Sequence, residues 1–254
     1  MRRELVINAD DLGMWEPVNA GILEAFSANR LTQASLMATG PAYERAIDLI
    51  EASGLRTGVH LVLASEWDLV RWGPLTDGQS LMSEDGTFPF HVRDLSGVAD
   101  EEEVLEEFAA QVRRCRAHGV DVSHVDSHVC VYEIELLKRF VGELDLPCRE
   151  IDVDEATEHP RRIVSQYCPT PENRSDKLPK LLDYVRGMRE GRHMLIVHPA
   201  VPGEELQRMC SREMGERYRW ATEFRITDLE VLLSQEFGDL LEEENIRLVT
   251  SACE

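Results

Sequence analysis

Short apolar runs alternate with amphipathic stretches along most of the chain, and this alternation limits the fold more than any other feature of the sequence. The clearest apolar runs, which we interpret as strands, cover 5–7, 34–38, 58–63, 121–131, 193–198 and 246–250. Weaker strand patterns cover 148–153 and 162–167. Helical patterns cover 17–29, 100–117, 133–144, 176–190 and 227–244, and another helix starts near Pro41. Repeated strand–helix units predict a parallel sheet with helices outside it.

About seven strands favour a β/α barrel, closed or nearly closed, over an open doubly wound sheet. Periodicity alone does not decide whether the barrel closes. We therefore expect an α/β protein in which 1–254 form a single domain, with parallel strands inside and helices outside. The stretch 64–99 interrupts the alternation, contains several Gly and Pro, and is expected to be a long loop or insertion near the functional site.

Charge and hydropathy exclude several partners. The net charge is −21, from 48 acidic and 27 basic residues, so the field of the protein repels nucleic acid and anionic membranes. No apolar run approaches the roughly 18 residues that a membrane span requires. The N-terminus leads directly into a strand rather than a signal peptide, so we expect a cytoplasmic protein. A homodimer is compatible with the sequence, which does not decide the oligomeric state.

Polar residues fall where several of the predicted strands end. Asp10 and Asp11 follow the first strand, His60 lies in the third, the 124–128 segment lies in the fourth, and His198 follows a late strand. In parallel β/α folds, catalytic groups gather at the carboxyl ends of the strands. These side chains are therefore expected to converge.

The fourth strand carries three polar residues with period two. His124, Asp126 and His128 would share one face of the strand. Burying them is costly unless hydrogen bonds or a metal ion satisfy them. A solvated His–Asp pair at the mouth of the sheet is the simpler alternative.

Taken singly, the other polar residues also have simple explanations. The Asp pair could cap a helix or form a turn, and His60 could be a hydrogen-bonded core histidine. Taken together, two imidazoles and a carboxylate on three strand ends suit zinc or another divalent ion. We therefore expect one divalent metal ion, with open positions for water and substrate.

The ordered set of motifs resembles the YdjC-like carbohydrate deacetylases, which include chitooligosaccharide deacetylase. The matching segments are Asn-Ala-Asp-Asp-Leu-Gly at 8–13, Gly-Val-His-Leu at 58–61, His-Val-Asp-Ser-His at 124–128 and Val-His-Pro at 197–199, with further similarity over 36–41 and 232–251. The resemblance covers nearly the whole chain. It implies a β/α-barrel-like fold and hydrolysis of N-acetyl groups from amino sugars with one divalent ion, zinc or magnesium.

Roles for individual residues follow from the same resemblance. It implies Asp11, His60 and His124 as metal ligands. It implies Asp10 as the general base, which takes a proton from water, and His198 as the general acid, which protonates the leaving amine.

Other residues are expected around this centre. Asp126 and His128 would lie behind the ligands or touch the substrate. Trp15, Trp67 and Trp72 are candidates for stacking on a sugar ring, since the apolar face of a pyranose packs on aromatic side chains.

Two segments depart from the family pattern. Many members continue the histidine strand with further histidines, whereas this chain has Val-Cys-Val-Tyr at 129–132, and 145–190 is short and poorly matched. Both departures concern substrate recognition more than the metal centre.

Three alternatives to an amino-sugar deacetylase acting on short chitooligosaccharides stay open. A phosphoesterase on a similar barrel would need more ligands, often a second metal ion, and basic residues for phosphate. A silent carbohydrate-binding protein on the same scaffold would usually have lost Asp10 or His198, and both are present. Deacetylation of another amino sugar, such as a lipid-linked one, is the third.

Overall fold

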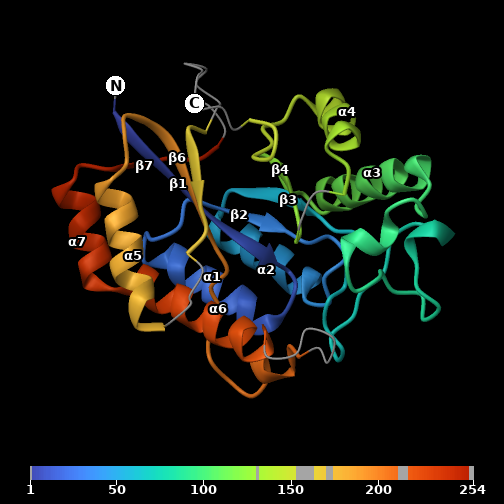
Figure 1. Ribbon diagram of the computed structural model, residues 1–254, viewed down its shortest axis with the longest axis horizontal. Coiled ribbons are helices and arrows are strands. Elements are labelled where there is room, and N and C mark those ends of the chain that lie inside the picture. The colour runs from blue at the N-terminus through green and yellow to red at the C-terminus, as the bar shows by residue number, and fades with distance from the viewer. Residues whose placement is uncertain (1, 130–131, 153–162, 170–173, 211–216, 252–254) are drawn as a thin grey trace.

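The computed structural model describes residues 2–129, 132–152, 163–169, 174–210 and 217–251 (Figure 1). The strands are β1 (Arg3–Leu12), β2 (Gln33–Leu36), β3 (Thr57–Leu61), β4 (Val125–Ser127), β5 (Ser165–Tyr167), β6 (Gly191–Val197) and β7 (Arg247–Leu248). The α-helices are α1 (Glu16–Ser27), α2 (Tyr43–Ser53), α3 (Glu101–Ala117), α4 (Ile134–Leu144), α5 (Arg174–Arg186), α6 (Arg217–Leu233) and α7 (Gln235–Glu243). Short 3₁₀ turns are η1 (Gln79–Leu81), η2 (Val92–Leu95) and η3 (Leu206–Arg208).

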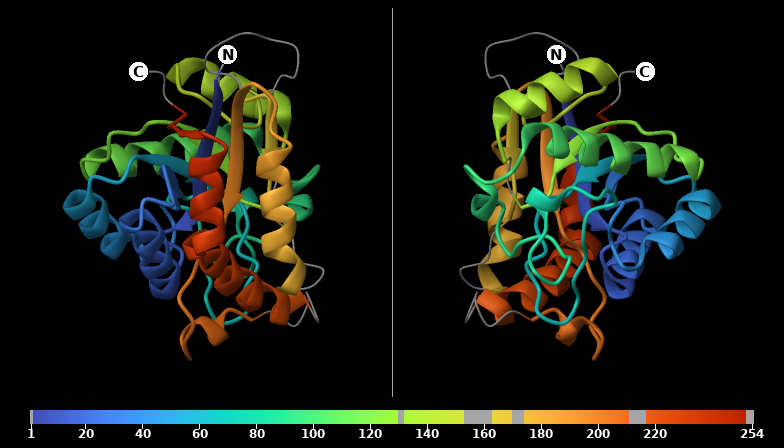
Figure 2. Two further views of the ribbon diagram at one scale, coloured as in Figure 1. Left: turned by 90° about the vertical axis from the view of Figure 1, so that its left-hand side faces the viewer. Right: turned by 90° about the vertical axis from the view of Figure 1, so that its right-hand side faces the viewer.

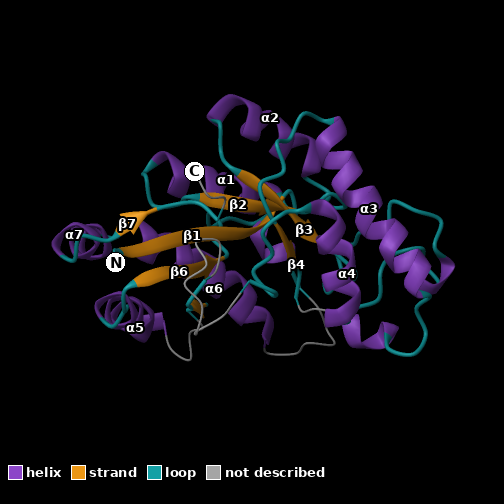
Figure 3. Cartoon of the chain, turned by 90° about the horizontal axis from the view of Figure 1, so that it is seen from above, coloured by secondary structure: helices purple, strands orange, loops and turns teal. Residues whose placement is uncertain are grey.

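The strands form one parallel sheet with β1 at its centre. Its order is β4-β3-β2-β1-β6-β5, and β7 pairs with the start of β1 on the edge that β2 occupies further along. Seen from above, the sheet lies in the middle and the helices surround it (Figure 3). The predicted α/β fold, with about seven parallel strands and outer helices, is confirmed.

The sheet is a curled half-barrel rather than a closed barrel. Within the described ranges, β4 and β5 lie at opposite ends of the strand order and do not pair with each other. Next to β4, the part of the chain that the structure describes continues the edge only as an isolated bridge between Val125 and Cys148. At the other end, α5 and α7 lie side by side along β6 (Figure 2).

The helix boundaries follow ordinary capping chemistry. Asp100 caps α3 by accepting hydrogen bonds from the backbone N–H groups of Glu102 and Glu103, at the end where acidic residues favour the helix dipole. Pro17 lies in the first turn of α1, where its missing N–H costs nothing. Gly54 ends α2 with a φ of 69°, a conformation that glycine adopts without strain.

Several predicted boundaries were wrong. In the described part of 121–131, which ends at residue 129, only β4 is a strand, because a strand persists only where a neighbour pairs with its backbone, and β3 pairs with Val125 to Ser127. The predicted 148–153 strand reduces to the bridge at Cys148, and its last residue lies outside the described ranges. In the described part of 162–167, only Ser165–Tyr167 form a strand. The 227–244 helix is two helices, because Ser234 stops α6 and caps α7 by accepting a bond from the Phe237 N–H.

The central strand is buried on both faces, from Leu5 to Leu12. This is the pattern of a parallel sheet covered by helices on one side and by inward-facing side chains on the other. Among the described helices, none combines the length and hydropathy that a membrane crossing would require. The described cysteines are free thiols, namely Cys115, Cys148, Cys168 and Cys210.

Candidate active site

Buried carboxylates and imidazoles converge at the carboxyl ends of β1, β3 and β4. Asp10 and Asp11 lie near the end of β1, and His60 of β3 is in register with Asp126 of β4. His128 follows β4 directly. All five side chains are less than a tenth exposed. The predicted convergence of these strand ends is what the structure shows.

Three of these side chains present one atom each to a common point. Asp11 Oδ1 lies 3.0 Å from His128 Nδ1 and 3.4 Å from His60 Nε2. The ligand atoms of the three residues all lie within 4.8 Å of one another, close enough to surround one metal ion. A carboxylate and two imidazoles form the N,N,O donor set that suits a borderline divalent ion.

An irregularity near the end of β1, where its register against β2 shifts between Ala9 and Leu12, directs Asp11 into this group. Asp11 has a φ of 69°, a left-handed conformation that Asp tolerates better than most residues. Gly13 follows with a φ of 86°, and its N–H donates to Asn19 Oδ1 at 2.7 Å. The chain therefore turns sharply, so that consecutive aspartates face different partners.

Each of the three groups is held from its other side by a buried partner. Asp126 Oδ1 lies 2.7 Å from His60 Nδ1, and Arg225 Nη2 donates to Asp11 Oδ2 at 2.7 Å. His128 Nε2 lies 3.1 Å from both carboxylate oxygens of Glu66.

The residues fit a divalent ion. His60 Nε2 is buried and makes no hydrogen bond within the described residues, although it faces the carboxylates of Asp10 and Asp11 at 3.7 and 3.4 Å. A buried ring nitrogen that faces two carboxylates and has no hydrogen-bond partner among the described residues is suited to bind a cation. With Asp126 on its outer nitrogen, His60 has the carboxylate–histidine arrangement that is common in metal sites.

The electrostatics favour positive charge at this point. Burial alone would lower the pKa of His60, but Asp10 and Asp126 outweigh it and raise the pKa to about 10. Burial also opposes protonation of His128, yet Glu66 and Asp11 raise its pKa to about 9. A metal ion displaces protons from the side chains that bind it. A divalent cation can therefore replace the positive charges that His60 and His128 carry when both rings are protonated.

Arginine offsets the remaining carboxylate charge. Although burial favours the neutral acid, Arg225 and His128 hold the pKa of Asp11 well below its usual range. Burial likewise opposes ionisation of Asp126, and Arg149 and His60 overcome it and lower its pKa. Both carboxylates are therefore ionised, as metal ligands and their partners must be.

Asp10 has a different environment from Asp11. Arg149 binds its carboxylate with two parallel hydrogen bonds of 2.7 Å, and Asn8 Nδ2 donates a third to Oδ1 at 2.7 Å. Oδ2 also faces His60 Nε2 at 3.7 Å and His198 Nε2 at 3.8 Å. Asp10, His60 and Asp126 form a second possible ligand group, but its atoms are already engaged by Arg149 and by the His60–Asp126 bond.

His124 does not join the ligand group, which differs from the prediction. Its ring lies deeper in the sheet, with Nε2 3.1 Å from Ser35 Oγ and Nδ1 2.9 Å from Ser123 Oγ. Alternate residues of a strand share a face but advance about 3.3 Å per residue, so His124 and His128 are separated by roughly 13 Å of chain. One ion cannot bind at both levels, and the structure brings His128 to Asp11 and His60.

Space for the His124 ring comes from a glycine on the neighbouring strand. A Cβ atom at Gly58 would lie 2.5 Å from the imidazole carbons. Burial then lowers the pKa of His124 to about 4, although Asp126 opposes the shift. His124 is therefore a neutral ring in a buried hydrogen-bond network.

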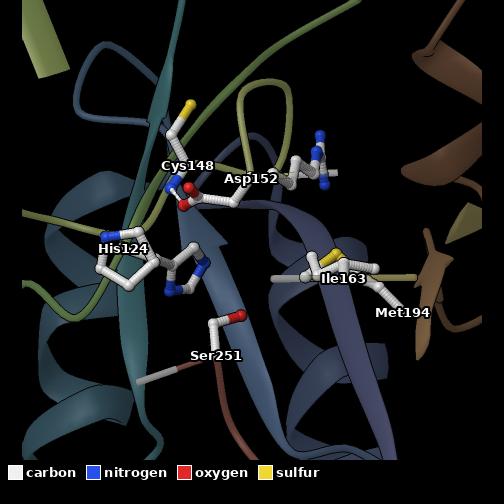
Figure 4. Close-up of a pocket in the computed structure, with 8 residues that line it drawn as sticks. His124, Cys148, Asp152, Ile163, Met194 and Ser251 are labelled. Atoms are coloured by element: carbon white, nitrogen blue, oxygen red, sulfur yellow. Dashed lines mark hydrogen bonds between the residues drawn. The ribbon is translucent and has the colours of Figure 1, made fainter. Parts of the chain in front are cut away.

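A small cavity beside this ring lies inside the curl of the sheet (Figure 4). Its lining consists of His124, Pro147, Cys148, Arg149, Asp152, Ile163, Met194 and Ser251. The cavity has a volume of about 10 Å³, which suits one water molecule and no sugar. Substrate must therefore approach from the strand ends rather than through this cavity.

His198 lies next to Asp10 and is one-fifth exposed. Its backbone N–H donates to Asp228 Oδ2 at 2.6 Å, and its ring Nδ1 is 4.0 Å from the same oxygen. Lys177 neutralises Asp228 through a buried ion pair of 2.5 Å. Burial lowers the pKa of His198, although Asp11 and Asp10 oppose the shift.

Two of the three tryptophans proposed for sugar stacking are buried in the core. Trp67 and Trp72 are 6% and 4% exposed, and the Trp72 indole N–H donates to the Ala64 carbonyl at 2.7 Å. A ring with no exposed face cannot stack on a sugar, so that role does not suit either. Trp15 is partly exposed, and its indole N–H donates to the Glu205 carbonyl at 3.1 Å.

Comparison with known proteins shows which family the chain belongs to. The sequence pattern of the YdjC-like proteins matches residues 4–243. The chain belongs to the YdjC-like family. Two relatives of this YdjC-like protein are "Carbohydrate deacetylase 2" of Listeria innocua serovar 6a, 29% identical over 97% of each chain, and "Carbohydrate deacetylase" of Geobacillus stearothermophilus, 34% identical over 71% of each chain.

A solved structure confirms the fold of the YdjC-like chain. It is a crystal structure of a proposed cellobiose-phosphate cleavage protein from Enterococcus faecalis V583. The two structures superpose with a TM-score of 0.79 at 24% sequence identity, covering 99% of this chain and 98% of the other.

The sequence patterns missed four residues of the site. Glu66 and Arg149 follow the short apolar segments 58–63 and 146–148, so charged residues just after an apolar run were a usable signal. Arg225 and Asp228 lie on α6, away from any strand end, and only the packing of that helix brings them to Asp11 and His198.

Proposed function

We propose that this protein is a metal-dependent carbohydrate deacetylase that removes the N-acetyl group of an amino sugar or a short chitooligosaccharide and releases acetate. The observation that carries the proposal is the convergence of Asp11 Oδ1, His60 Nε2 and His128 Nδ1, with Asp10 and His198 alongside. The shared name of the relatives supports hydrolytic deacetylation of a carbohydrate.

Asp11, His60 and His128 would hold the ion. A divalent ion, zinc or magnesium, supplies Lewis-acid chemistry, polarising a carbonyl group and making a water molecule more acidic. The ligand set now contains His128 in place of the predicted His124. The expected chemistry is unchanged, because the donors are still one carboxylate and two imidazoles.

Asp10 would accept the proton of the attacking water. A carboxylate oxygen can accept two hydrogen bonds. Among the described residues, Asp10 Oδ1 accepts one from Asn8 and one from Arg149, whereas Oδ2 accepts only one, from Arg149. Oδ2 is therefore the atom with a free acceptor site, and Arg149 fixes its direction.

His198 would protonate the leaving group. In the reaction, the water oxygen bonds to the acetamide carbon, the carbon–nitrogen bond breaks, and the sugar nitrogen gains a proton. His198 Nε2 lies 3.8 Å from Asp10 Oδ2, so proton uptake and proton donation occur within one small site. The products are acetate and a free amino sugar.

Acetate release from N-acetylglucosamine and its short oligomers tests this proposal. Release should stop after treatment with a chelator and return when zinc or magnesium is restored. If no compound in the series yields chelator-sensitive acetate, deacetylation of these sugars is contradicted, and a lipid-linked amino sugar or a silent carbohydrate-binding role would be the next hypothesis.

A phosphoesterase is the second candidate, and one observation favours it. Two candidate ligand groups lie side by side and share His60, and the buried guanidinium groups of Arg149 and Arg225 lie close by. Both arginines are occupied by aspartates, however, which leaves them poorly suited to bind phosphate. A metal count of one ion per chain supports the deacetylase, and a count of two supports phosphate chemistry.

A further inference from the structure

We propose that Glu66 is a positioning residue that keeps the proton of His128 on Nε2, so that Nδ1 binds the ion. The inference deepens the proposed function and rests on the metal site described there. It assigns a task to the long loop after β3, from which Glu66 comes.

The contacts of His128 define the two ends of its ring. Nδ1 faces Asp11 Oδ1 at 3.0 Å, on the side where His60 Nε2 also points. Nε2 faces both oxygens of Glu66 at 3.1 Å. A carboxylate accepts hydrogen bonds and does not donate when ionised, so the nitrogen that faces Glu66 carries the proton. A neutral imidazole has one protonated nitrogen, and Nδ1 is then the unprotonated ligand atom.

His60 has the opposite arrangement. Its Nδ1 lies 2.7 Å from Asp126 Oδ1, and its Nε2 faces the ligand cluster. The two ligand histidines therefore present different nitrogens to the same point. In each ring, a separate carboxylate determines which nitrogen carries the proton. Asp126 comes from the sheet, whereas Glu66 comes from the loop.

The residues around Glu66 are fixed in place, as a positioning role requires. The N–H of Ser65 donates to the Pro89 carbonyl at 2.8 Å, and the Ser65 hydroxyl accepts from the Trp72 N–H at 3.0 Å. On the other side, the Asp68 N–H donates to the Cys210 carbonyl at 2.7 Å. Glu66 itself is only 6% exposed.

Aromatic neighbours restrict the His128 ring as well. The Trp72 ring meets it edge-on with centroids 6.0 Å apart, and the His60 ring meets it edge-on at 5.2 Å. Loop residues thus supply both the hydrogen bond and part of the packing that orient His128. The buried carboxylate of Glu66 would be costly there without such a partner.

Zinc titration of the metal-free protein by calorimetry tests the role of Glu66. We expect Glu66→Ala to bind zinc about 10–100-fold more weakly than the unchanged protein, the usual cost of losing a partner behind a ligand. Glu66→Gln should lose less, because its amide oxygen still accepts a hydrogen bond from Nε2. Equal affinity in Glu66→Ala and the unchanged protein would overturn the inference.

Glu107→Gln is the matched control. Glu107 is a buried carboxylate that anchors the same loop, by accepting bonds from the Leu75 and Thr76 N–H groups at 2.9 and 3.0 Å, without touching His128. We expect this variant to keep its zinc affinity. A loss equal to that of Glu66→Ala would mean that loop stability, not the His128 bond, sets the affinity, and would overturn the inference.

Imidazole ¹⁵N NMR of the zinc-loaded protein gives a readout that a purely structural role would not move. His128 should carry its proton on Nε2 and His60 on Nδ1, with each ring assigned in the unchanged protein through bonds from its own Cβ atom. A proton on Nδ1 of His128 would overturn the role of Glu66. Absence of zinc binding by the unchanged protein would instead contradict the proposed function itself.

Discussion

His124 and His128 lie four residues apart at the two ends of β4, and the structure gives them opposite environments. His124 contacts the neutral side chains of Gln33, Ser35 and Ser123, and burial outweighs the Asp126 carboxylate 3.8 Å away and lowers the pKa of His124 to about 4. His128 lies between the carboxylates of Asp11 and Glu66, which overcome the effect of burial and raise its pKa to about 9. The same residue type is a neutral structural group in one place and, in the other, a cation that we propose as a metal ligand.

The difference shows that depth along a strand decides the role of a polar residue in this sheet. Around His124, the side chains of Asn8, Gln33 and Ser251 bond to one another, with Gln33 Nε2 donating to Asn8 Oδ1 at 2.8 Å and to Ser251 Oγ at 2.9 Å. The polar groups of this inner network find their hydrogen-bond partners within the protein. At the strand ends, His60 Nε2 is left without a hydrogen bond among the described residues.

Removal of His128 should produce the largest effect. His128→Ala deletes a ligand, so metal affinity should fall by more than the roughly 10–100-fold that an outer partner costs, and acetate release should fall with it. His124→Ala is the matched comparison and should keep one ion per chain. Metal analysis of both purified proteins checks the prediction. If His124→Ala loses its metal and His128→Ala does not, the assignment of His128 rather than His124 as the ligand is wrong.

Asp10 connects the two regions, since it bonds to Asn8 of the inner network and faces His60 and His198 at the mouth. If it is the general base, Asp10→Asn should lower the turnover rate about 10²–10⁴-fold. The metal content should stay unchanged, because Asp10 is outside the ligand group. Steady-state kinetics and metal analysis of the same preparation test this, and unchanged turnover would contradict the role.

The buried His124 ring should make the stability of the protein depend on pH. Its pKa is about 4 in the folded protein and near 6.5 when unfolded, so the unfolded state takes up the proton first as the pH falls. Between pH 6.5 and 4 the folded protein should lose up to about 3 kcal/mol of stability from this group. His124→Gln should flatten that part of the profile relative to the unchanged protein. Urea unfolding at several pH values measures the difference, and parallel profiles would contradict it.

Gly58 offers a smaller and purely structural test. Gly58→Ala puts a methyl group 2.5 Å from the His124 ring and should destabilise the protein by about 1–3 kcal/mol without changing its affinity for metal. In the Gly58→Ala/His124→Ala double variant the clash is absent, so the two costs should not add. Thermal unfolding of the four proteins in this cycle gives the coupling. Simple additivity would show that His124 does not pack on Gly58 as described.

The sequence predicted the parts of the molecule that depend on local pattern. Alternating strands and helices predicted the parallel α/β fold, and the acidic start at Asp100 predicted the beginning of α3. Polar residues after apolar strands identified Asp10, Asp11, His60 and His198 as neighbours in space. Weakly paired segments such as 121–131 were misjudged, because strand length depends on a partner that the local sequence does not reveal.

The tertiary structure decided which of these residues face one another. A period of two places His124 and His128 on one face, but only the register of β4 against β3, with His60 opposite Asp126, determines which histidine is level with Asp11. Likewise, Glu66, Arg149 and Arg225 bond to their partners only because the loop, the turn and the helix that carry them pack against the strand ends. Periodicity determines the direction of a side chain, whereas its level and its partners depend on how distant segments pack.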